Sequence, residues 1–281
     1  MELKCGNRSL DLSLPRVMGI LNVTPDSFSD GGCFNSLDRA LKRAEQLLLD
    51  GADILDIGGE STRPGAAPVS EQEELDRVIP VVAAIAERLD VAISVDTSSA
   101  QVMQASAAAG AHLLNDVRSF TRHGALDVAA ASGLPICIMH MKGEPQVMQQ
   151  APHYDEPIEE AVFAFLRQQV IRCEAAGIDQ GRILIDPGFG FGKSHEHNYR
   201  LLNRLEHLRS LGLPVLAGLS RKRMIGEATG VAGADQRLLG SVAGAVICAM
   251  KGAKILRVHD VRETAEAIRV VRATLKEGSE G

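Results

Sequence analysis

Aromatic side chains are scarce in this chain of 281 residues, which contains 7 Phe, 2 Tyr and no Trp. Proteins that bind single-stranded nucleic acid stack bases on exposed aromatic rings, and few rings are present here. Positive charge is not in excess either, because 36 acidic residues outnumber 30 Lys and Arg and give a net charge of −6. A broad nucleic-acid surface is usually basic. We therefore expect no nucleic-acid partner.

Long apolar segments and closely spaced cysteines are also missing. The longest uncharged apolar stretch, Leu238–Met250, is shorter than the roughly 20 residues that a membrane-spanning helix needs. The N-terminal residues contain no apolar core of signal-peptide length. The five cysteines are scattered and form no CxxC, so neither a disulfide framework nor a zinc site is indicated. These absences predict a cytoplasmic protein with reduced thiols and no membrane partner.

The sequence does contain eight short apolar runs, each ending at or near a Gly, Asn, Asp or Pro before a helical pattern begins. Strands that are buried on both faces have such nearly continuous apolar runs. From Val17 in the first run to Ile255 in the last, the repeat is about 34 residues, which is typical of the strand–helix unit of a barrel. The runs are Val17–Val23, Asp53–Gly59, Val91–Asp96, His112–Val117, Pro135–His140, Arg182–Pro187, Pro214–Ser220 and Lys254–Val258.

Amphipathic or alanine-rich stretches between these runs predict helices. They are Leu37–Asp50, Glu71–Leu89, Glu159–Ala176, Tyr199–Leu211, Asp235–Lys251 and Arg262–Lys276. No linker or shift in composition divides the chain, so residues 1–281 are expected to form a single domain. Two short apolar stretches around Gly6-Asn7 predict a hairpin that plugs the bottom of the barrel. The predicted fold is α/β, an eight-stranded parallel (β/α)8 TIM barrel with a short N-terminal β-hairpin, and an open doubly wound sheet is the alternative.

Polar residues follow most of the predicted strands. The carboxyl ends of the strands in such a barrel meet at one mouth, which is where active sites lie. An Asp or Asn there is also a common helix cap, so Asp96 taken alone fits a cap equally well. Caps do not account for Arg and Lys at the same positions. The set is Asn22, Glu60-Ser61-Thr62-Arg63, Asp96, Asn115-Asp116, His140, Asp186, Ser220-Arg221-Lys222, Arg257 and His259.

These residues divide into two chemical groups. One group supplies hydrogen-bond acceptors that suit a flat heterocycle with amino and ring N–H groups: Asp96, Asn115 and Asp186. The other supplies donors for an anion such as phosphate: Arg63, Arg257 and His259. Lys222 has three further interpretations, as an exposed residue, a helix start or a Schiff-base lysine, and the sequence leaves them open.

Two stretches are similar to other binding motifs. Gly188-Phe-Gly-Phe-Gly192-Lys193-Ser194 follows a predicted strand as a P-loop does, but its outer glycines enclose three residues where the motif has four. His195-Glu196-His197 contains two metal-binding residue types, but a third ligand is not evident. We expect no ATP-binding P-loop in the first stretch and a solvated loop in the second.

Two long connections at the mouth, Thr24–Asn35 and Ser61–Ser70, are rich in Gly, Pro, Ser and Asp. Long loops of this kind are more often functional than short ones. Phe28 in the first loop has no evident partner. It belongs either to a small local cluster or to a mobile lid over the substrate.

Two long motifs begin at the first two predicted strands, and shorter ones follow along the chain. The long motifs are Met18-Gly-Ile-Leu-Asn22-Val-Thr-Pro-Asp-Ser-Phe-Ser-Asp-Gly-Gly32 and Asp56-Ile-Gly-Gly-Glu60-Ser-Thr-Arg-Pro-Gly65. The shorter ones are Ser94-Val-Asp96-Thr, Asn115-Asp116, Met139-His140-Met141, Asp186-Pro-Gly-Phe-Gly-Phe-Gly-Lys193, Ser220-Arg-Lys222 and Arg257-Val-His259-Asp. In this order, from about residue 16 to residue 260, they resemble the signatures of the dihydropteroate synthases, a family of pterin-binding enzymes.

The resemblance implies a transferase of folate biosynthesis on an eight-stranded α/β barrel. In the implied reaction, 4-aminobenzoate displaces diphosphate from (7,8-dihydropterin-6-yl)methyl diphosphate to give 7,8-dihydropteroate. The resemblance further implies Mg²⁺ as cofactor, a homodimer, and inhibition by sulfonamides, which mimic 4-aminobenzoate. Breaking a C–O bond to diphosphate leaves negative charge that Mg²⁺ and arginines stabilise, so no activated protein nucleophile is needed.

The same resemblance implies a role for individual residues. Pterin binding is implied for Asp96, Asn115, Met139, Asp186 and Lys222. Diphosphate binding is implied for Asn22, Thr62, Arg63, Arg257 and His259, and Asn22 would also hold the metal. The aminobenzoate pocket would comprise Phe28, Pro64, Phe191 and Arg221. The catalytic residues would be Asp96, Lys222, Arg257 and, in the first loop, Asp30.

Other functions remain open at this point. A pterin-binding methyltransferase on a related barrel, which uses a methylated folate and a corrinoid partner, is the main alternative. A non-catalytic pterin-binding paralogue and a Schiff-base aldolase that uses Lys222 are two more. Arg223 stands where some members of the family carry serine near the aminobenzoate carboxylate. A direct side-chain contact at that position is therefore left open, although a backbone N–H at a helix start can still bind a carboxylate.

Overall fold

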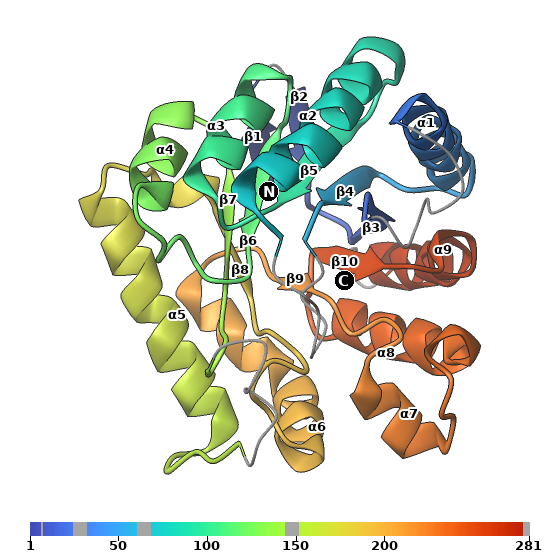
Figure 1. Cartoon of the computed structure of the whole chain (residues 1–281). Coiled ribbons are helices and arrows are strands. Elements are labelled where there is room, and N and C mark those ends of the chain that lie inside the picture. The colour runs from blue at the N-terminus through green and yellow to red at the C-terminus, as the bar shows by residue number, and fades with distance from the viewer. Residues whose placement is uncertain (7, 25–32, 61–68, 144–151, 278–281) are drawn as a thin grey trace.

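The structure is a computed structural model that describes residues 1–6, 8–24, 33–60, 69–143 and 152–277, apart from the side chains of residues 33–36. Within these ranges, eight parallel strands form one sheet in the order β8-β7-β6-β5-β4-β3-β10-β9. A single parallel bridge between Ile185 and Val215 joins the two ends of this order, so the sheet curls into a barrel. Helices surround it (Figure 1). The predicted (β/α)8 barrel is confirmed, and the open sheet is excluded.

Each predicted apolar run contains one strand, because these residues are buried on both faces. The strands are β3 (Arg16–Asn22), β4 (Ile54–Gly58), β5 (Ala92–Asp96), β6 (Leu113–Asp116), β7 (Ile136–Met139), β8 (Ile183–Asp186), β9 (Leu216–Ala217) and β10 (Ile255–Val258). β9 is much shorter than its run predicted. Beyond Ala217 the chain leaves the ladder and leads to the turn at Arg221, which has a positive φ of 60°.

The helices mostly agree with the predicted stretches. They are α1 (Cys33–Leu49), α2 (Glu71–Arg88), α3 (Ala100–Ala108), α4 (Ala125–Ser132), α5 (Ile158–Ala175), α6 (His195–Asn203), α7 (Arg223–Thr229), α8 (Leu238–Met250) and α9 (Val261–Glu277). Short 3₁₀ helices occur at η2 (Gln180–Arg182), η3 (Leu205–Leu211) and η4 (Ala234–Gln236). The single helix predicted over Tyr199–Leu211 is therefore wrong, since α6 ends at Asn203 and η3 follows.

The solvated loop predicted at His195-Glu196-His197 is also wrong. These residues form the first turn of α6, because Ser194 accepts a hydrogen bond from the His197 N–H and the His197 side chain accepts one from the Ser194 N–H. Such a reciprocal cap starts a helix. His195 lies 3.1 Å from Glu227 on α7, so its ring links two helices.

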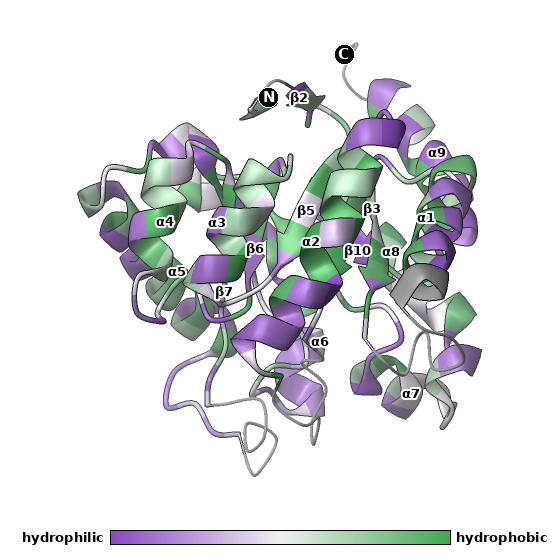
Figure 2. Cartoon of the chain, turned by 45° about the horizontal axis from the view of Figure 1, so that its top comes forward, coloured by the Kyte–Doolittle hydropathy of each residue, from purple (hydrophilic) through white to green (hydrophobic). Residues whose placement is uncertain are grey.

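The N-terminal hairpin closes the bottom of the barrel, as predicted. β1 (Glu2–Cys5) pairs antiparallel with β2 (Arg8–Asp11). Leu3, Cys5 and Leu12 are buried against the interior residues at the amino ends of the strands. Figure 2 shows β2 at one end of the barrel and α6 and α7 toward the other. Ligands can therefore enter the barrel only at its opposite end, the mouth.

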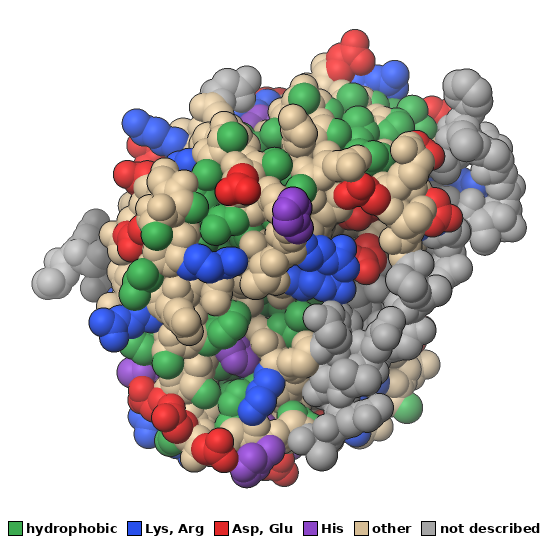
Figure 3. Space-filling view, turned by 60° about the vertical axis from the view of Figure 1, so that its left-hand side comes forward, with side chains coloured by type: hydrophobic (Ala, Val, Ile, Leu, Met, Phe, Trp, Pro, Cys, Tyr) green, Lys and Arg blue, Asp and Glu red, His purple; other side chains and the backbone are tan. Residues whose placement is uncertain are grey.

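The outer surface has a mixed character. Figure 3 shows the side at the left of Figure 1, where acidic and basic side chains lie interspersed among apolar and uncharged ones. None of the helices in the described ranges has both the length and the apolar content needed to span a membrane.

Candidate active site

The sheet register brings three predicted site residues to one level at the mouth. Asn22 on β3 pairs with Gly58 on β4, Gly58 pairs with Asp96 on β5, and Asp96 pairs with Asn115 on β6. Residues in register on neighbouring strands project to the same face of the sheet. A Cβ on Gly58 would lie 3.7 Å from the Asp96 Cβ and 3.9 Å from the Asn22 Oδ1. The glycine thus leaves open the space between the Asn22 amide and the Asp96 carboxylate.

Arg257 on β10 lies between two carboxylates. Its Nε donates to Asp56 Oδ2 at 2.5 Å, and its Nη2 donates to Asp96 Oδ2 at 2.8 Å. Burial raises the pKa of Asp96 to about 7, although the Arg257 charge opposes the shift. Burial disfavours the Arg257 cation, but Asp56 and Asp96 outweigh it and raise the pKa of this guanidinium. Arg257 therefore stays charged, and its side chain remains 22% exposed toward the mouth.

Asp186 and Lys222 form a second charged group. Asp186 ends β8 and accepts a hydrogen bond from the Gly188 N–H at 2.7 Å. Burial raises the pKa of Asp186, and Lys222 opposes the shift. Burial likewise lowers the pKa of Lys222 to about 8, against the attraction of Asp186. The charges of Arg257 and Asp96 also act on the pKa of Lys222, so the two charged groups lie near each other at the mouth.

The segment Gly188–Gly192 covers one side of this space. The Lys222 Nζ donates to the Phe189 carbonyl at 2.5 Å and lies 4.5 Å from the centroid of the Phe191 ring. A Cβ on Gly188 would stand 1.9 Å from the His140 carbonyl oxygen, and one on Gly192 would stand 2.2 Å from the Lys142 carbonyl oxygen. The glycines therefore let this loop lie directly against the chain that follows β7.

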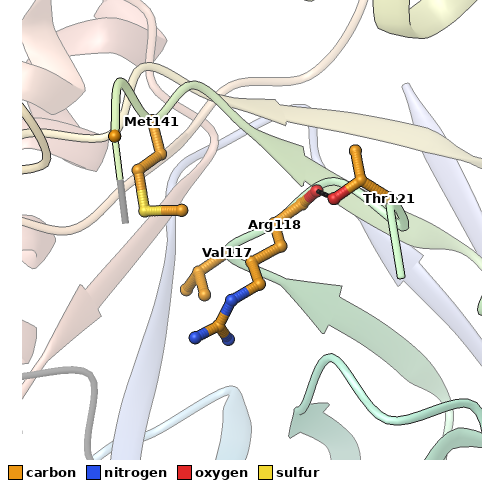
Figure 4. Close-up of a pocket in the computed structure, with 5 residues that line it drawn as sticks. Val117, Arg118, Thr121 and Met141 are labelled. Atoms are coloured by element: carbon orange, nitrogen blue, oxygen red, sulfur yellow. Dashed lines mark hydrogen bonds between the residues drawn. The ribbon is translucent and has the colours of Figure 1, made fainter. Parts of the chain in front are cut away.

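A small apolar cluster lies beside the loop. Met139, Val117 and Phe191 are buried against one another. Next to them is a cleft of about 280 Å³. Its lining residues, four of which Figure 4 labels, are Val117, Arg118, Thr121, Met141 and Gly143. The apolar cluster can therefore contact the face of a flat ligand at the mouth.

Arg221, for which the resemblance implied an aminobenzoate contact, pairs with Asp260. Its Nε donates to Asp260 Oδ2 at 3.0 Å, and a second guanidinium nitrogen binds the other carboxylate oxygen. Its backbone has a φ of 60°, and its N–H donates to the Ser241 Oγ at 2.9 Å. The guanidinium is thus held by Asp260, and the aminobenzoate role of Arg221 stays a prediction.

His259 and Arg223 complete the predicted residues near β9 and β10. The His259 Nδ1 lies 3.1 Å from the Ser220 Oγ, which also accepts from the His259 N–H. Arg223 is the first residue of α7, and its side chain is 79% exposed and paired with Glu227 at 2.6 Å. His259 therefore belongs to the mouth, whereas the Arg223 side chain lies on the surface.

Several predicted residues lie outside the described part of the chain. They are Phe28, Asp30, Thr62, Arg63 and Pro64. Their implied roles stay predictions.

One residue of the predicted set has a structural role. Asp116 is fully buried and accepts hydrogen bonds from the Ser98 hydroxyl and from the Arg118 and Phe120 N–H groups. It supports a turn in which Ser119 and Phe120 have positive φ values of 53° and 58°. Asp116 is therefore an anchor for the connection after β6.

The structure also reveals residues that the sequence reasoning passed over. Asp56 lies in the middle of a fully buried strand and pairs with Arg257 and the Ser94 hydroxyl. A charged residue at such a position needs a partner, and this was the available signal. Arg118 pairs with Glu60 at 3.4 Å and donates to Ser98 at 3.1 Å, and no motif marked it.

Comparisons with known proteins identify the family. A family model described as pterin binding enzyme matches residues 18–259. The chain is 58% identical to the dihydropteroate synthase of Escherichia coli (strain K12) over 275 residues, which cover 98% of this chain and 97% of that protein. It is 53% identical to the dihydropteroate synthase of Haemophilus influenzae, covering 98% and 99%.

Solved structures agree with this result. The Yersinia pestis dihydropteroate synthase in complex with a sulfonamide drug has a TM-score of 0.93 and 57% identity, covering 98% of this chain and all of that one. The Xanthomonas albilineans dihydropteroate synthase in complex with 7,8-dihydropteroate has a TM-score of 0.89 and 48% identity, covering 98% and 99%. Since the match extends over nearly the whole length at this identity, the chain belongs to the pterin-binding enzyme family, within the dihydropteroate synthases.

Proposed function

We propose that this chain joins 4-aminobenzoate to (7,8-dihydropterin-6-yl)methyl diphosphate and releases 7,8-dihydropteroate and diphosphate. The observation that carries the proposal is the convergence of two charged groups, Asp96 with Arg257 and Asp186 with Lys222, on one space at the mouth. The carboxylates offer acceptors to a heterocycle, and the cations offer donors to an anion. A dihydropterin diphosphate contains both parts.

The pterin is held by the acceptors at the strand ends. Asp186 binds the amino and ring N–H groups through charge-assisted hydrogen bonds, and Asn115 binds from β6. Lys222 donates to the ring system, while Met139 packs against its face as part of the cluster with Val117. Because Asp186 is only 7% exposed, water competes weakly for its oxygens, which favours recognition of this ring.

Diphosphate is bound by the donors. Arg257 is held by Asp56 and Asp96, so its guanidinium is oriented before the substrate arrives. Its exposed side is available for the diphosphate. Thr62, Arg63 and His259 supply the further donors.

Mg²⁺ is the proposed cofactor, and the donor set fits it. Mg²⁺ prefers oxygen ligands, keeps several waters and usually binds through one or two protein groups together with substrate phosphates. Asn22 presents an amide oxygen toward the gap at Gly58. The described residues contain no cluster of three or more His, Cys, Asp or Glu that could hold a metal ion. When bound, Mg²⁺ stabilises negative charge on the leaving diphosphate.

The reaction forms a C–N bond and breaks a C–O bond and an N–H bond. The arylamine nitrogen of 4-aminobenzoate bonds to the methylene carbon of the pterin, and the C–O bond to diphosphate breaks with its electron pair leaving on oxygen. The nitrogen then loses a proton to water or to the released diphosphate. The protein holds the two substrates in line and stabilises the leaving charge through Arg257.

The second substrate binds beside the loop that carries Phe191. Phe28, Pro64 and Phe191 form its apolar walls, and Lys222 lies over the Phe191 ring. Sulfonamides resemble 4-aminobenzoate in shape and charge distribution. They are therefore expected to compete for this position.

The active protein is proposed to be a homodimer that assembles through α8. Leu239, Ile247 and Met250 on this helix are 82%, 42% and 51% exposed. Val270 on the neighbouring α9 is 67% exposed. Apolar residues gathered on one surface commonly mark an interface.

The test is direct. The protein is incubated with both substrates and Mg²⁺, and diphosphate and dihydropteroate are measured together. Equal amounts of the two products support the proposal. Methyl transfer to a corrinoid protein without diphosphate release would overturn it.

A further inference from the structure

Lys193 is a buried residue near the mouth to which the proposed reaction gives no role. It is 2% exposed. Its Nζ lies 2.8 Å from the Gly188 carbonyl oxygen, 3.2 Å from that of Phe191 and 3.3 Å from that of His140. The Nδ1 of His140 is 2.8 Å away. The lysine of the P-loop-like stretch therefore points into the protein and contacts backbone.

Lys193 is the donor in the backbone contacts. Carbonyl oxygens only accept hydrogen bonds, so the N–H groups must come from Lys193 whether its amine is charged or neutral. Burial lowers the pKa of Lys193 well below its usual value, and Asp186 opposes the shift. Burial, together with the Lys193 charge, lowers the pKa of His140 to about 2, so this histidine stays neutral beside it.

The carbonyls that Lys193 binds belong to the loop that carries the site. The Gly188 N–H donates to Asp186 at 2.7 Å, and the Phe189 carbonyl accepts from Lys222 at 2.5 Å. The Phe191 ring lies under the Lys222 Nζ. One side of the loop thus contacts the two proposed pterin-binding charges, and the other side is held by Lys193.

A loop of this composition needs an outside anchor. Gly188, Gly190 and Gly192 all have positive φ, between 65° and 80°. Glycine loses more conformational freedom on ordering than any other residue, so a segment with three glycines does not set its own shape. The donors of Lys193 join Gly188 at one end of the loop to Phe191 near the other.

We infer that Lys193 is a positioning residue for both substrates: it fixes the loop of residues 188–192 and thereby holds Asp186, Lys222 and Phe191 in their binding positions. This inference rests on the proposed function. Lys193 itself touches neither substrate. Its effect is on substrate affinity, through the geometry of the groups that do.

The test compares two lysine-to-methionine variants. Lys193→Met keeps a long, unbranched side chain, one atom shorter, that cannot donate a hydrogen bond. Lys254→Met is the matched control, since the Lys254 Nζ also donates to a carbonyl, that of Ser13 at 2.9 Å, at the bottom of the barrel. The Kd for the pterin and for Mg²⁺-diphosphate, the KM for 4-aminobenzoate and the urea midpoint are measured for both.

We expect Lys193→Met to weaken pterin binding and to raise the KM for 4-aminobenzoate, each by about tenfold or more. The diphosphate Kd is expected to stay within about twofold of native, because Arg257 is oriented by Asp56 and Asp96 and not by the loop. Lys254→Met is expected to change none of these three constants. Lys193→Met can also have a lower urea midpoint. A loss of stability alone would not weaken pterin binding and leave diphosphate binding unchanged.

Three results would overturn the inference. One is a pterin Kd and an aminobenzoate KM that both remain native in Lys193→Met, whatever its stability. Another is an equal loss of pterin and diphosphate affinity, which indicates general damage. If Lys193→Met does not fold, Lys193→Leu replaces it, because leucine is also apolar and cannot donate to the carbonyl oxygens. Native constants in Lys193→Leu would then count against the role. Failure of the native protein to form dihydropteroate is a separate result and refutes the proposed function instead.

Discussion

Asp96 is the residue at the mouth where burial and charge conflict most clearly. Its pKa is raised from 3.8 to about 7 because it is buried, with Arg257 opposing. A folded pKa above the unfolded value means that the folded state holds a proton that the unfolded state has lost. The stability that this proton provides is full below about pH 4 and is lost as the pH rises to about 7.

Asp96→Asn is expected to remove this pH dependence. From pH 5 to pH 7, native stability should fall relative to the variant by up to about 1.4 kcal/mol per pH unit. Urea unfolding at several pH values measures the difference. Asp90→Asn is the control, because the Asp90 side chain is 95% exposed. Parallel stability curves for native protein and Asp96→Asn would show that Asp96 titrates normally.

Asp186 is expected to contribute to the affinity for the pterin. Asp186→Asn replaces a charged acceptor by a neutral one, and one such hydrogen bond is worth about 1.5–3 kcal/mol, or about ten- to a hundredfold in Kd. We expect pterin binding to weaken by that factor, as measured by calorimetry. The same change at Asp53, which pairs with Arg16 and Arg272 away from the mouth, should lower stability without changing pterin affinity. Unchanged pterin affinity in Asp186→Asn would refute the assignment.

At the residue scale, sequence reasoning found the positions but not the pairings. Asn22, Asp96 and Asn115 could be placed at the mouth because each lies at or next to the end of a recognisable strand. The sharing of Arg257 between Asp56 and Asp96 joins residues 201 and 161 positions apart, and no local pattern contains that information. Arg221 depends on a positive φ at a residue other than glycine, which its sequence neighbours do not signal.

At the scale of elements, the loop of residues 188–192 is the part most sensitive to added atoms. Gly188→Ala would place a Cβ 1.9 Å from the His140 carbonyl oxygen at a φ of 66°. Backbone must move to relieve that contact, at a cost of about 2–5 kcal/mol. We expect lower stability in urea and weaker pterin binding, since the Gly188 N–H also binds Asp186.

Gly230→Ala introduces backbone strain without the steric contact that Gly188→Ala also creates. Its φ is 73°, but nothing lies within 4 Å of an added Cβ. Only the left-handed strain of about 1–2 kcal/mol remains, and pterin affinity should not change. Equal stability losses in the two variants would mean that the loop can move away from His140 freely.

Elements were easier to predict than their ends. The strands were visible because burial on both faces makes continuous apolar runs, as in β4 and β8. The break between α6 and η3 was missed because Leu201, Leu205 and Leu208 keep a helix-like apolar spacing through it. At His195–His197 the polarity of the residues concealed a helix start that Ser194 caps.

At the scale of the whole molecule, the two ends of the barrel differ. The hairpin fills the bottom with Leu3, Cys5 and Leu12, and the charged groups gather at the mouth. The repeat length and the apolar runs, with Gly, Asn, Asp or Pro near their ends, were sufficient to predict this architecture. Neither feature bears on assembly, because an interface depends on which apolar residues stay exposed after the barrel has formed.

The exposed apolar surface of α8 therefore carries the last prediction. Leu239, Ile247 and Met250 lie within one face of the helix, where their burial by a second copy would remove apolar area from water. Sedimentation equilibrium of the native chain should give about twice its mass of 30.0 kDa. Leu239→Glu combined with Ile247→Glu should give the monomer, because charges would be buried without partners at a self-complementary surface.

Leu49→Glu is the matched control, since Leu49 is 83% exposed but lies at the end of α1. The same substitution there should leave the mass unchanged, so that loss of the dimer can be attributed to the surface and not to added charge. A native chain that sediments as a monomer, or a double variant that still sediments as a dimer, would place any interface elsewhere. If only the α8 variant dissociates, its Kd for the pterin shows whether pterin binding at the mouth requires the dimer. We expect that Kd to be native, because Asp186, Lys222 and Arg257 interact within one chain.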